Sequence, residues 1–462
     1  MIELRNVEVV KNGRRLFETL NWTIKPNEHW VIAGPNGSGK TILLELIAGN
    51  AHAAHGEVVY DFVNGNTWDE RFIQRKQNVH YIPAHAIQTF LQHHELFYQQ
   101  RYYSIGDERI PRVRDLFGDD VARLHALDFP PSFNIDGLLD IEVTRLSNGQ
   151  LKKVLILKNL VRDLPKVLLF DYPFEGLDHA SRNDLIVFMD HLAITYGIQV
   201  VLVDHEHHLP AVINRKLVLN QFKIVSEEEV RHQPASVIPN DTIYSYTNGS
   251  GTPVAEMKNV TIRYGEKEII SNLNWKIYAG ERWALTGRNG SGKTTLFSLI
   301  FADHPMAYSQ KVYLFGKRRG SGESIWDIKN RINYLGPELI SYLNPQHITM
   351  TVKEYMLGQQ KTMSVAALER VIAFFDAQSF IAKPVKQLSS GQLQLTLIML
   401  SLLSDKELIL LDEPFQFLDT NTKDRVSQYL QEHLHEDTTL VLITHYEQDI
   451  ARWTKQRLHL QR

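Results

Sequence analysis

The chain of 462 residues contains no cysteine. This absence excludes disulfides, thiolate zinc sites, iron–sulfur clusters and a cysteine nucleophile, and it fits a reducing compartment. An excess of charge of one sign is also missing, because 50 Lys and Arg stand against 53 Asp and Glu, a formal net charge of −3. A chain whose main partner is a nucleic acid backbone is usually basic, so this balance disfavours that class of partner.

Long hydrophobic runs are absent too. The most apolar stretch, Leu393–Leu403, has about half the length of a bilayer-spanning helix. The first six residues lack the basic segment and apolar run of a secretory signal. Hydrophobic residues make up 43% of the chain, enough for buried cores, and the length predicts about two to four domains. We therefore expect a folded cytoplasmic protein, at most peripheral on the inner face of the cell membrane.

The sequence repeats itself. The segment Gly34–Thr41, GPNGSGKT, recurs 253 residues later as GRNGSGKT at Gly287–Thr294. Between the copies, residues 226–253 contain three consecutive Glu and several Pro and Gly, without a sustained apolar period, and are expected to be a linker. A repeat of this kind predicts two similar domains, at 1–225 and 254–462.

Short apolar runs alternate with helical patterns in each half. Trp30–Ala33 precedes the first glycine-rich segment, and Ile42–Ile47 follows it with helical character. Val167–Phe170 and Val200–Val203 are short and apolar, as buried parallel strands are. Alternation of strands and helices predicts an α/β fold with a sheet in each half.

Both glycine-rich segments match the P-loop pattern G-x-x-x-x-G-K-[ST], each after a predicted strand and before a predicted helix. Glycines let the backbone wrap closely around phosphate, and the helix start adds a positive dipole. Lys40 and Lys293 are expected to reach the β- and γ-phosphates, and the hydroxyls of Thr41 and Thr294 to bind Mg²⁺. The other predicted nucleotide-binding residues of the loops are Gly34, Asn36, Gly37, Gly39, Gly287, Asn289, Gly290, Gly292 and Thr295.

Two aspartates are candidates for the second magnesium contact. Asp171 ends the apolar run Val167–Phe170, and Asp412 ends the run Leu408–Leu411. A lone aspartate after a strand is more often a cap or turn residue. Here the P-loop earlier in each half favours metal binding, because P-loop enzymes hold Mg²⁺ with such an aspartate.

The second half carries further motifs in a fixed order: Leu-Ser-Ser-Gly-Gln at 388–392, Asp-Glu-Pro at 412–414, Leu-Asp at 418–419, then His445. Together with the P-loop, this order resembles the ATP-binding cassette (ABC) ATPases, and the resemblance covers nearly the whole chain, twice. It implies an α/β fold of two tandem P-loop NTPase domains. Each domain would have a mostly parallel sheet core, an antiparallel β subdomain and a helical signature subdomain.

One stretch carries a closer likeness. The run Tyr313–Lys329 is similar to the ModF-type tandem ATP-binding proteins of molybdenum transport. This likeness implies the ATPase subunit of a membrane importer, with a transmembrane permease as partner and molybdate or a related anion as cargo. The alternative interpretation is that the run is a surface loop and helix start with no bearing on substrate.

The resemblance also implies how ATP would be bound. In ABC ATPases two cassettes dimerise head to tail, and each nucleotide lies between one P-loop and the opposite signature motif. Within this single chain, Ser389 and Gly391 would complete the site of the first P-loop. Ser147 and Gly149, from the first Leu-Ser-Asn-Gly-Gln, would complete the site of the second. ATP and Mg²⁺ are the implied cofactors.

The halves differ where catalysis is expected. The family pattern assigns Glu413 to the attacking water, with His445 and Lys293 beside the γ-phosphate. Tyr172 takes the place of that glutamate in the first half, and a phenol with a pKa near 10 is no base at neutral pH. We therefore expect an ATPase that hydrolyses mainly at the second P-loop site.

Two more pairs of equivalent positions bear on the comparison of the halves. Tyr264 stands where the family stacks an aromatic ring on adenine, and Lys11 is its counterpart in the first half. His205 is the counterpart of His445. It begins the run His-Glu-His-His, but adjacent residues point in different directions, and a catalytic zinc site usually needs three convergent ligands. We expect a structural or surface role for His207 and His208.

One departure from the family weakens the transport hypothesis. The family has a glutamine that contacts magnesium and couples to the membrane subunit, but His85 and Glu338 occupy that place, and Gln88 could substitute only if the loop shifts. Two alternatives therefore stay open. One is a soluble twin-cassette ATPase acting in regulation, in repair or on ribosomes or nucleic acid. The other is a nucleotide-operated switch with little hydrolysis.

Overall fold

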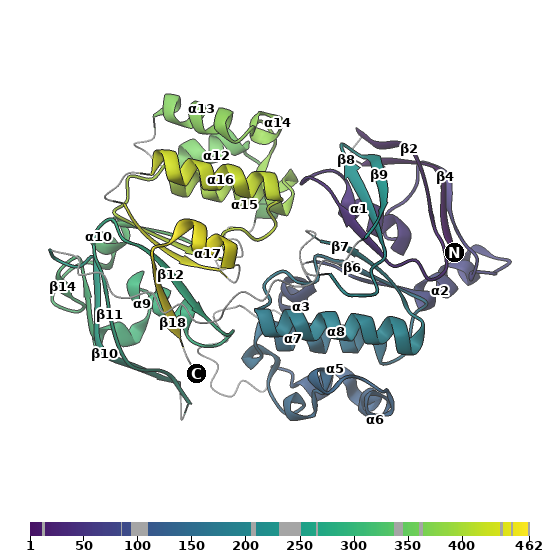
Figure 1. Ribbon diagram of the computed structural model, residues 1–462, viewed down its shortest axis with the longest axis horizontal. Coiled ribbons are helices and arrows are strands. Elements are labelled where there is room, and N and C mark those ends of the chain that lie inside the picture. Colours follow the sequence, from purple (N-terminus) through teal and green to yellow (C-terminus); the bar gives the residue numbers. More distant parts are fainter. Residues whose placement is uncertain are drawn as a thin grey trace. The chain divides into compact units, whose positions relative to one another are not determined.

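The computed structural model describes residues 1–11, 14–84, 86–93, 110–204, 209–230, 251–264, 267–336, 345–359, 364–434, 438–444 and 447–460. The chain divides into two compact units, Met1–Val237 and Ile238–Arg462 (Figure 1). Each unit contains one predominantly parallel sheet and one antiparallel sheet. This architecture confirms the α/β fold class with two tandem domains.

The first unit begins with an antiparallel sheet of order β2-β1-β4, in which β1 pairs with both neighbours. Its main sheet has the order β5-β6-β7-β3-β8-β9, parallel except for the β8–β9 hairpin. The strands are β1 Ile2–Lys11, β2 Arg14–Ile24, β3 Trp30–Ala33, β4 His55–Tyr60, β5 Val79–Ile82, β6 Val167–Asp171, β7 Gln199–Val203, β8 Arg215–Asn220 and β9 Lys223–Glu229.

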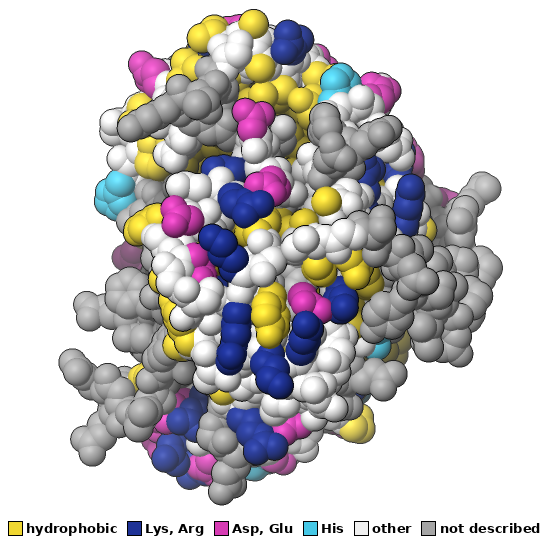
Figure 2. Space-filling model, turned by 90° about the vertical axis from the view of Figure 1, so that its left-hand side faces the viewer, with side chains coloured by type: hydrophobic (Ala, Val, Ile, Leu, Met, Phe, Trp, Pro, Cys, Tyr) yellow, Lys and Arg dark blue, Asp and Glu magenta, His cyan; other side chains and the backbone are white. Residues whose placement is uncertain are grey.

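The second unit repeats this plan. Its antiparallel sheet has the order β11-β10-β13-β14, and its main sheet, β15-β16-β17-β12-β18, is entirely parallel. The strands are β10 Ala255–Tyr264, β11 Lys267–Ile277, β12 Arg282–Gly287, β13 Lys311–Leu314, β14 Lys317–Arg318, β15 Ile332–Leu335, β16 Leu408–Asp412, β17 Thr439–Ile443 and β18 Gln456–Leu460. Lysine and arginine side chains gather on the side of the molecule where β10, β11 and β14 lie (Figure 2).

Helices flank the main sheets and form a helical part in each unit (Figure 1). In the first unit they are α1 Lys40–Ala48, α2 Trp68–Asn78, α3 Ala86–His93, α5 Val113–Phe117, α6 Val121–Ala126, α7 Asn148–Leu160 and α8 His179–Tyr196. In the second they are α9 Lys293–Ile300, α10 Ile325–Lys329, α12 Val352–Gln359, α13 Val365–Phe374, α14 Gln378–Ile381, α15 Ser390–Leu402, α16 Thr420–His433 and α17 Glu447–Trp453.

The apolar patterns of the sequence are explained by burial. Strands β3, β6 and β7 are buried along their whole length, as are β16 and β17. The apolar stretch Leu393–Leu403 lies almost entirely within α15, whose residues pack in a core with Leu411 and Leu442. An apolar helix of this length is a core element of the domain, because packing against strands and helices surrounds it.

Part of the expected linker is a strand. Residues 226–229 belong to β9 and pair with β8. Lys216 lies 3.5 Å from Glu228, and Arg215 lies 3.9 Å from both Glu227 and Glu229. These cross-strand ion pairs place the acidic run on a sheet edge. The three glutamates that we expected in a solvated linker are therefore part of β9, where they pair with basic residues of β8, and a linker can begin only after Glu229.

Candidate functional site

The two P-loops have the same backbone. The first two glycines of each loop have φ angles of 138° and 81° at Gly34 and Gly37, and 143° and 79° in the second unit. Gly39 and Gly292, with φ of 102° and 98°, are the N-caps of α1 and α9. Positive φ is costly for residues with a Cβ. A Cβ on Gly34 would also lie 2.0 Å from the carbonyl oxygen of Leu219, so these positions need glycine.

Each P-loop lysine folds back onto its own loop. Lys40 donates to the carbonyl oxygens of Gly34 at 2.7 Å and Pro35 at 2.8 Å. Lys293 makes the same bonds to Gly287 at 2.7 Å and to Arg288 at 3.1 Å. Both lysines are buried, and Asn36 and Asn289 are half-buried in the loops. The ammonium groups therefore sit inside the cradle where phosphate oxygens are expected.

The predicted magnesium residues come together at the carboxyl ends of the sheets. The Thr41 hydroxyl donates to Asp171 at 3.0 Å, across 130 residues of sequence, and Thr294 donates to Asp412 at 3.2 Å. Burial raises the pKa of Asp171 to about 6, against the hydrogen bonds that it accepts from Thr41 and Tyr81. Hydroxyl and carboxylate oxygens are the protein ligands that Mg²⁺ takes beside phosphates, so the residues fit this ion.

The residue after each aspartate has the same unusual backbone. Tyr172 has a φ of 46° and Glu413 a φ of 49°, in the left-handed region that side chains rarely adopt. Their N–H groups donate to the last residue of the neighbouring strand, Val203 at 3.0 Å and Ile443 at 2.9 Å. The two units therefore share the same strained backbone conformation at equivalent positions but differ in the side chain, which is a buried phenol in the first unit and a carboxylate in the second. Strain of this kind is typical of functional sites.

The signature motifs are helix starts. Ser147 is the N-cap of α7, where its Oγ accepts from the N–H of Gln150 and that side chain accepts from the N–H of Ser147. Ser389 forms the same capping box at the start of α15. The glycine of each motif is buried, and a Cβ on Gly149 would lie 2.5 Å from the Ser181 hydroxyl. The spacing S-x-x-Q in the sequence is itself a capping-box signal.

The first unit contains a buried charged cluster that no sequence motif indicates. Lys152 of α7 donates to the carbonyl oxygen of Tyr172 at 3.5 Å and of Glu175 at 3.3 Å. Burial lowers the pKa of Lys152 to about 8, although Glu175 and Asp204 oppose this shift. In the second unit the corresponding contact is neutral, with Gln394 donating to Pro414 at 2.7 Å. Comparing the halves position by position would have revealed this difference.

Tyr81 is a second residue whose role only the structure reveals. It marked the repeat in the sequence, and its hydroxyl donates to Asp171 at 3.3 Å. Burial raises the pKa of Tyr81, which keeps the phenol protonated as a donor. Its counterpart Tyr334 packs its ring against Phe297 and Phe301.

Thr295, the remaining predicted nucleotide-binding residue of the second P-loop, is buried in α9.

Several predicted residues cannot be placed. His85, Glu338, His445 and the run 205–208 lie outside the described residues. The side chains of Lys11, Gln88 and Tyr264 are also outside the described part, although Lys11 and Tyr264 end the equivalent strands β1 and β10. Their roles therefore stay predictions.

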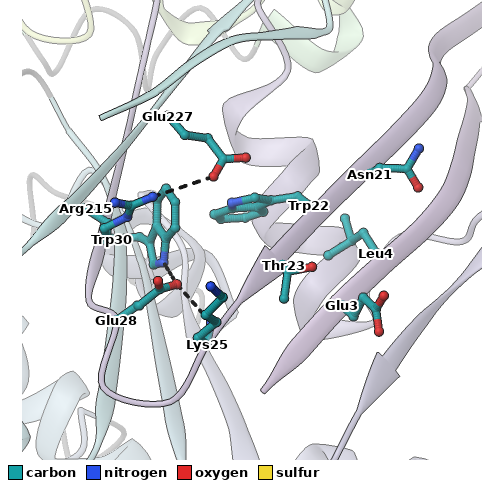
Figure 3. Close-up of a pocket in the computed structure, with 10 residues that line it drawn as sticks. All are labelled: Glu3, Leu4, Asn21, Trp22, Thr23, Lys25, Glu28, Trp30, Arg215 and Glu227. Atoms are coloured by element: carbon teal, nitrogen blue, oxygen red, sulfur yellow. Dashed lines mark hydrogen bonds and ion pairs between the residues drawn. The ribbon is translucent and has the colours of Figure 1, made fainter. Parts of the chain in front are cut away.

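One cavity of about 340 Å³ lies in the first unit (Figure 3). It is lined by Trp30 at the start of β3, whose Nε1 donates to Glu28 at 3.2 Å, and by Arg215, which lies over the Trp30 ring at 5.1 Å. The P-loop follows the other, carboxyl end of β3. Ligands of open α/β sheets bind at the carboxyl ends of the strands, so this cavity is separate from the candidate nucleotide site.

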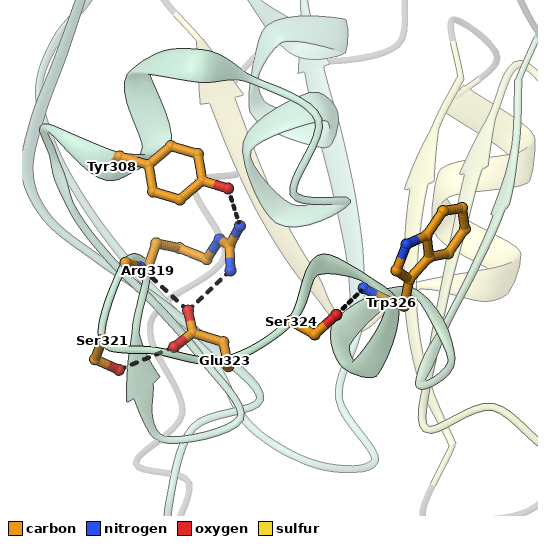
Figure 4. A network of polar contacts seen from close by, with 7 residues as sticks. Tyr308, Arg319, Ser321, Glu323, Ser324 and Trp326 are labelled. Carbon is orange, nitrogen blue, oxygen red and sulfur yellow. Dashed lines mark hydrogen bonds and ion pairs between the residues drawn. The ribbon is translucent and has the colours of Figure 1, made fainter.

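The run Tyr313–Lys329 covers the end of β13, then β14, a loop and α10. The fully buried Arg319 holds the loop by donating to Glu323 at 2.8 Å and to the Tyr308 hydroxyl at 3.1 Å (Figure 4). Glu323 also accepts from Ser321 at 2.9 Å. Arg319, Ser321 and Glu323 of the run thus bond to one another and, through Arg319, to Tyr308, so these residues have a structural role.

Among the helices in the described ranges, none combines the length and the apolar character needed to cross a bilayer.

Comparison with known proteins adds relatives that match nearly the whole chain. The profile of the family described as "ABC transporter" matches residues 17–175 and 270–416. An uncharacterized ABC transporter ATP-binding protein of Schizosaccharomyces pombe is 28% identical, with 96% of this chain and 94% of that protein covered. The ABC transporter ATP-binding protein ModF of Escherichia coli is also 28% identical, over 98% and 96% of the two chains.

Two solved structures resemble the fold. One is described as a model of ribosome-bound archaeal Pelota and ABCE1, with a TM-score of 0.63 and 20% identity, covering 98% of this chain and 76% of that one. The other is RNase-L Inhibitor, with a TM-score of 0.58 and 19% identity, covering 98% and 88%. At such identities the likeness concerns the fold.

Proposed function

The chain belongs to the ABC transporter family, and we propose that it is a tandem-cassette ATPase that hydrolyses ATP mainly at the second P-loop. The matched segments include both P-loops and both strand-end aspartates. Family membership supports ATP binding and hydrolysis by the chain as a whole. The assignment of hydrolysis to one site rests on the difference between the two units.

The observation that carries this assignment is the pair Tyr172 and Glu413. Both residues have left-handed φ angles, and both donate their N–H to the end of the adjacent strand. Because the backbone is equivalent, the side chain decides the chemistry. A carboxylate can accept a proton from a water molecule at neutral pH, whereas a protonated phenol cannot.

The residues of the second unit divide the work. Lys293 would exchange its bonds to loop carbonyls for phosphate oxygens, where its charge stabilises the transition state. Thr294 and Asp412 would hold Mg²⁺, which neutralises charge on the phosphates when bound. Glu413 would orient and polarise the attacking water. The first unit has the same lysine and threonine–aspartate pair, so we propose that it binds nucleotide and turns it over slowly.

We propose further that each site is completed by the signature of the other cassette. Ser147 and Ser389 stand at helix N-termini, where N–H groups and the helix dipole favour an anion. In this arrangement Ser147 and Gly149 would contact the γ-phosphate at the second P-loop, and Ser389 and Gly391 at the first. The tandem chain would thus form both sites without a second copy.

Steady-state hydrolysis of Mg-ATP by the purified full chain tests the proposal. Glu413→Gln should lower the turnover rate about 10²–10⁴-fold, the usual loss when a positioned general base is removed. Nucleotide binding should persist, since glutamine keeps the shape of the side chain. Tyr172→Phe is the matched variant and should leave turnover close to that of the wild type. Near wild-type turnover in Glu413→Gln would refute the assignment.

For the cellular role, we propose that this ATPase drives a membrane importer for molybdate or a related anion. The likeness to the ABC transporter ATP-binding protein ModF over 98% of the chain supports a role in transport, and the choice of cargo rests on the resemblance of Tyr313–Lys329 to the ModF-type proteins. The tagged protein, purified from its own cells in mild detergent, should bring down a transmembrane permease. Recovery in ribosomal fractions, with no permease, would instead favour the kind of role that the ribosome-bound neighbour suggests.

A further inference from the structure

The antiparallel sheet of the second unit has two different faces. Side chains alternate between the faces of a strand. Met257, Val260 and Val312 point into the core, whereas Lys258 and Lys311 are exposed on the opposite side. The outer face is therefore the part of this sheet that meets solvent.

Strand register gathers basic residues on this outer face. Glu256 pairs with Lys276 on one side and with Tyr313 on the other, and Tyr313 pairs in turn with Arg318. In the adjacent row, Lys258 pairs with Lys311. We call these residues the basic face: Lys258, Lys276, Lys311 and Arg318, with Glu256 and Tyr313. Figure 2 shows lysine and arginine side chains gathered across this side of the molecule.

One carboxylate serves two of the lysines. Glu256 lies 3.1 Å from both Lys258 and Lys276, whose side chains are about half exposed. Four cations against one carboxylate leave three positive charges within four adjacent strands. Neighbouring strands lie about 4.8 Å apart, so the charges are spread over roughly 15 Å. This is a concentrated positive field on a chain whose net charge is −3.

The first unit provides an internal reference. Its equivalent positions hold Glu3, Arg5, Thr23 and Glu57, which pair in the same register. Arg5 lies 2.7 Å from Glu3 and 3.6 Å from Glu57, so this face carries one negative charge. The same sheet position thus has opposite charge in the two units. The first unit, whose sheet lacks a counterpart of β14 and therefore of Arg318, forms the other three strands with the same pairing and without a basic face, so pairing of those strands does not require one.

We propose that the basic face of the second unit docks on an anionic membrane surface by binding lipid phosphate groups. Each lysine or arginine near such a surface adds about 1 kcal/mol of attraction. A sheet face with charges in two rows can contact several headgroups at once. This proposal goes beyond the ATPase assignment and does not depend on it.

The surface is less suited to single-stranded nucleic acid. Proteins that bind such strands offer aromatic rings on which bases stack. The ring of Tyr313 is half-buried, and Lys258 lies over it at 4.7 Å from the ring centre. The cation covers the ring that a base would need.

Vesicle sedimentation with the full chain tests the proposal. The wild type should bind phosphatidylcholine vesicles that contain about 30 mol% phosphatidylglycerol, but not vesicles of pure phosphatidylcholine. Binding should weaken as the salt concentration rises, because salt screens the charges. The variant Lys276→Thr with Lys311→Glu carries the first unit's residues and removes three charges. Its partition coefficient should fall about 100-fold, following the attraction per charge.

A matched control removes the same charge elsewhere. Lys223→Thr with Lys455→Glu changes two exposed lysines outside the basic face and should keep wild-type binding. Equal losses in the two double variants would overturn the proposal, as would wild-type protein that ignores anionic vesicles. Binding to a duplex or single-stranded RNA that the first variant abolishes, with no vesicle binding, would assign the face to nucleic acid and refute the lipid assignment. ATP turnover, measured in parallel, should not change in either variant.

Discussion

Breaking the buried ion pair between Arg319 and Glu323 should cost far more stability than breaking an exposed pair of similar geometry. The side chain of Arg319 has no exposed surface, and that of Glu323 is 7% exposed, with the charged atoms 2.8 Å apart. In Glu323→Gln the guanidinium stays buried and loses its counter-charge. Removing one partner of a buried pair typically costs about 3–5 kcal/mol.

An exposed ion pair between β10 and β11 of the same unit supplies the control. Arg263 and Glu268 are 2.6 Å apart, but their side chains are 64% and 33% exposed. Water solvates both charges in either state, so Glu268→Gln should cost about 0–1 kcal/mol. Because both variants convert a glutamate that pairs with arginine into glutamine, burial is the main difference between them.

Urea unfolding, followed by hydrogen exchange in residues 311–329, measures both effects in the unit that contains them. We expect a large fall in the midpoint for Glu323→Gln and a small one for Glu268→Gln. The double variant Arg319→Met with Glu323→Leu should be less destabilised than Glu323→Gln, because it leaves no buried charge behind. Equal losses for the two single variants would refute the reasoning that burial sets the cost.

Three other predictions address the nucleotide sites and pH. If each signature completes the site of the other cassette, Ser147→Ala should reduce ATP turnover more than Ser389→Ala. Both variants lose an equivalent helix cap, worth about 1 kcal/mol, so their unfolding curves should match while their turnover differs. A larger loss of turnover in Ser389→Ala would contradict the arrangement. Thr294→Val should raise the Mg²⁺ concentration needed for half-maximal turnover about tenfold or more, as expected for a lost charge-assisted contact, whereas Thr41→Val should leave it near the wild-type value. Burial raises the pKa of Asp449 from 3.8 to about 6, so the wild type loses stability as pH rises through this window. Above roughly pH 6, Asp449→Asn should therefore be more stable than the wild type by up to about 3 kcal/mol, and this advantage should shrink toward about pH 4, near the pKa of the unfolded chain. A difference in urea midpoints that stays constant with pH would argue against titration of this group.

Much of the site could be predicted because its motifs are local. A P-loop needs positive φ at its glycines, and only glycine adopts it without strain, so the sequence reports the backbone directly. The same is true of the signatures, since Ser147 and Gln150 satisfy each other's N–H groups within one turn. Because the sequence is a repeat, each of these motifs is seen in both halves, and aligning the halves also reveals the contrast between Tyr172 and Glu413.

Contacts between distant residues were decided by the tertiary structure. Tyr81 meets Asp171 across 90 residues, and Lys152 reaches the carbonyl of Tyr172, because parallel strands and a crossing helix bring them to one edge. Strand register also gathers Lys258 and Lys311 on one face of a chain with net negative charge. The sequence by itself determined the local backbone and the chemical types at the nucleotide loops, since these depend on neighbouring residues. Only the fold decided which distant side chains share a surface or a bond, because strand pairing and helix packing join residues that no local spacing relates.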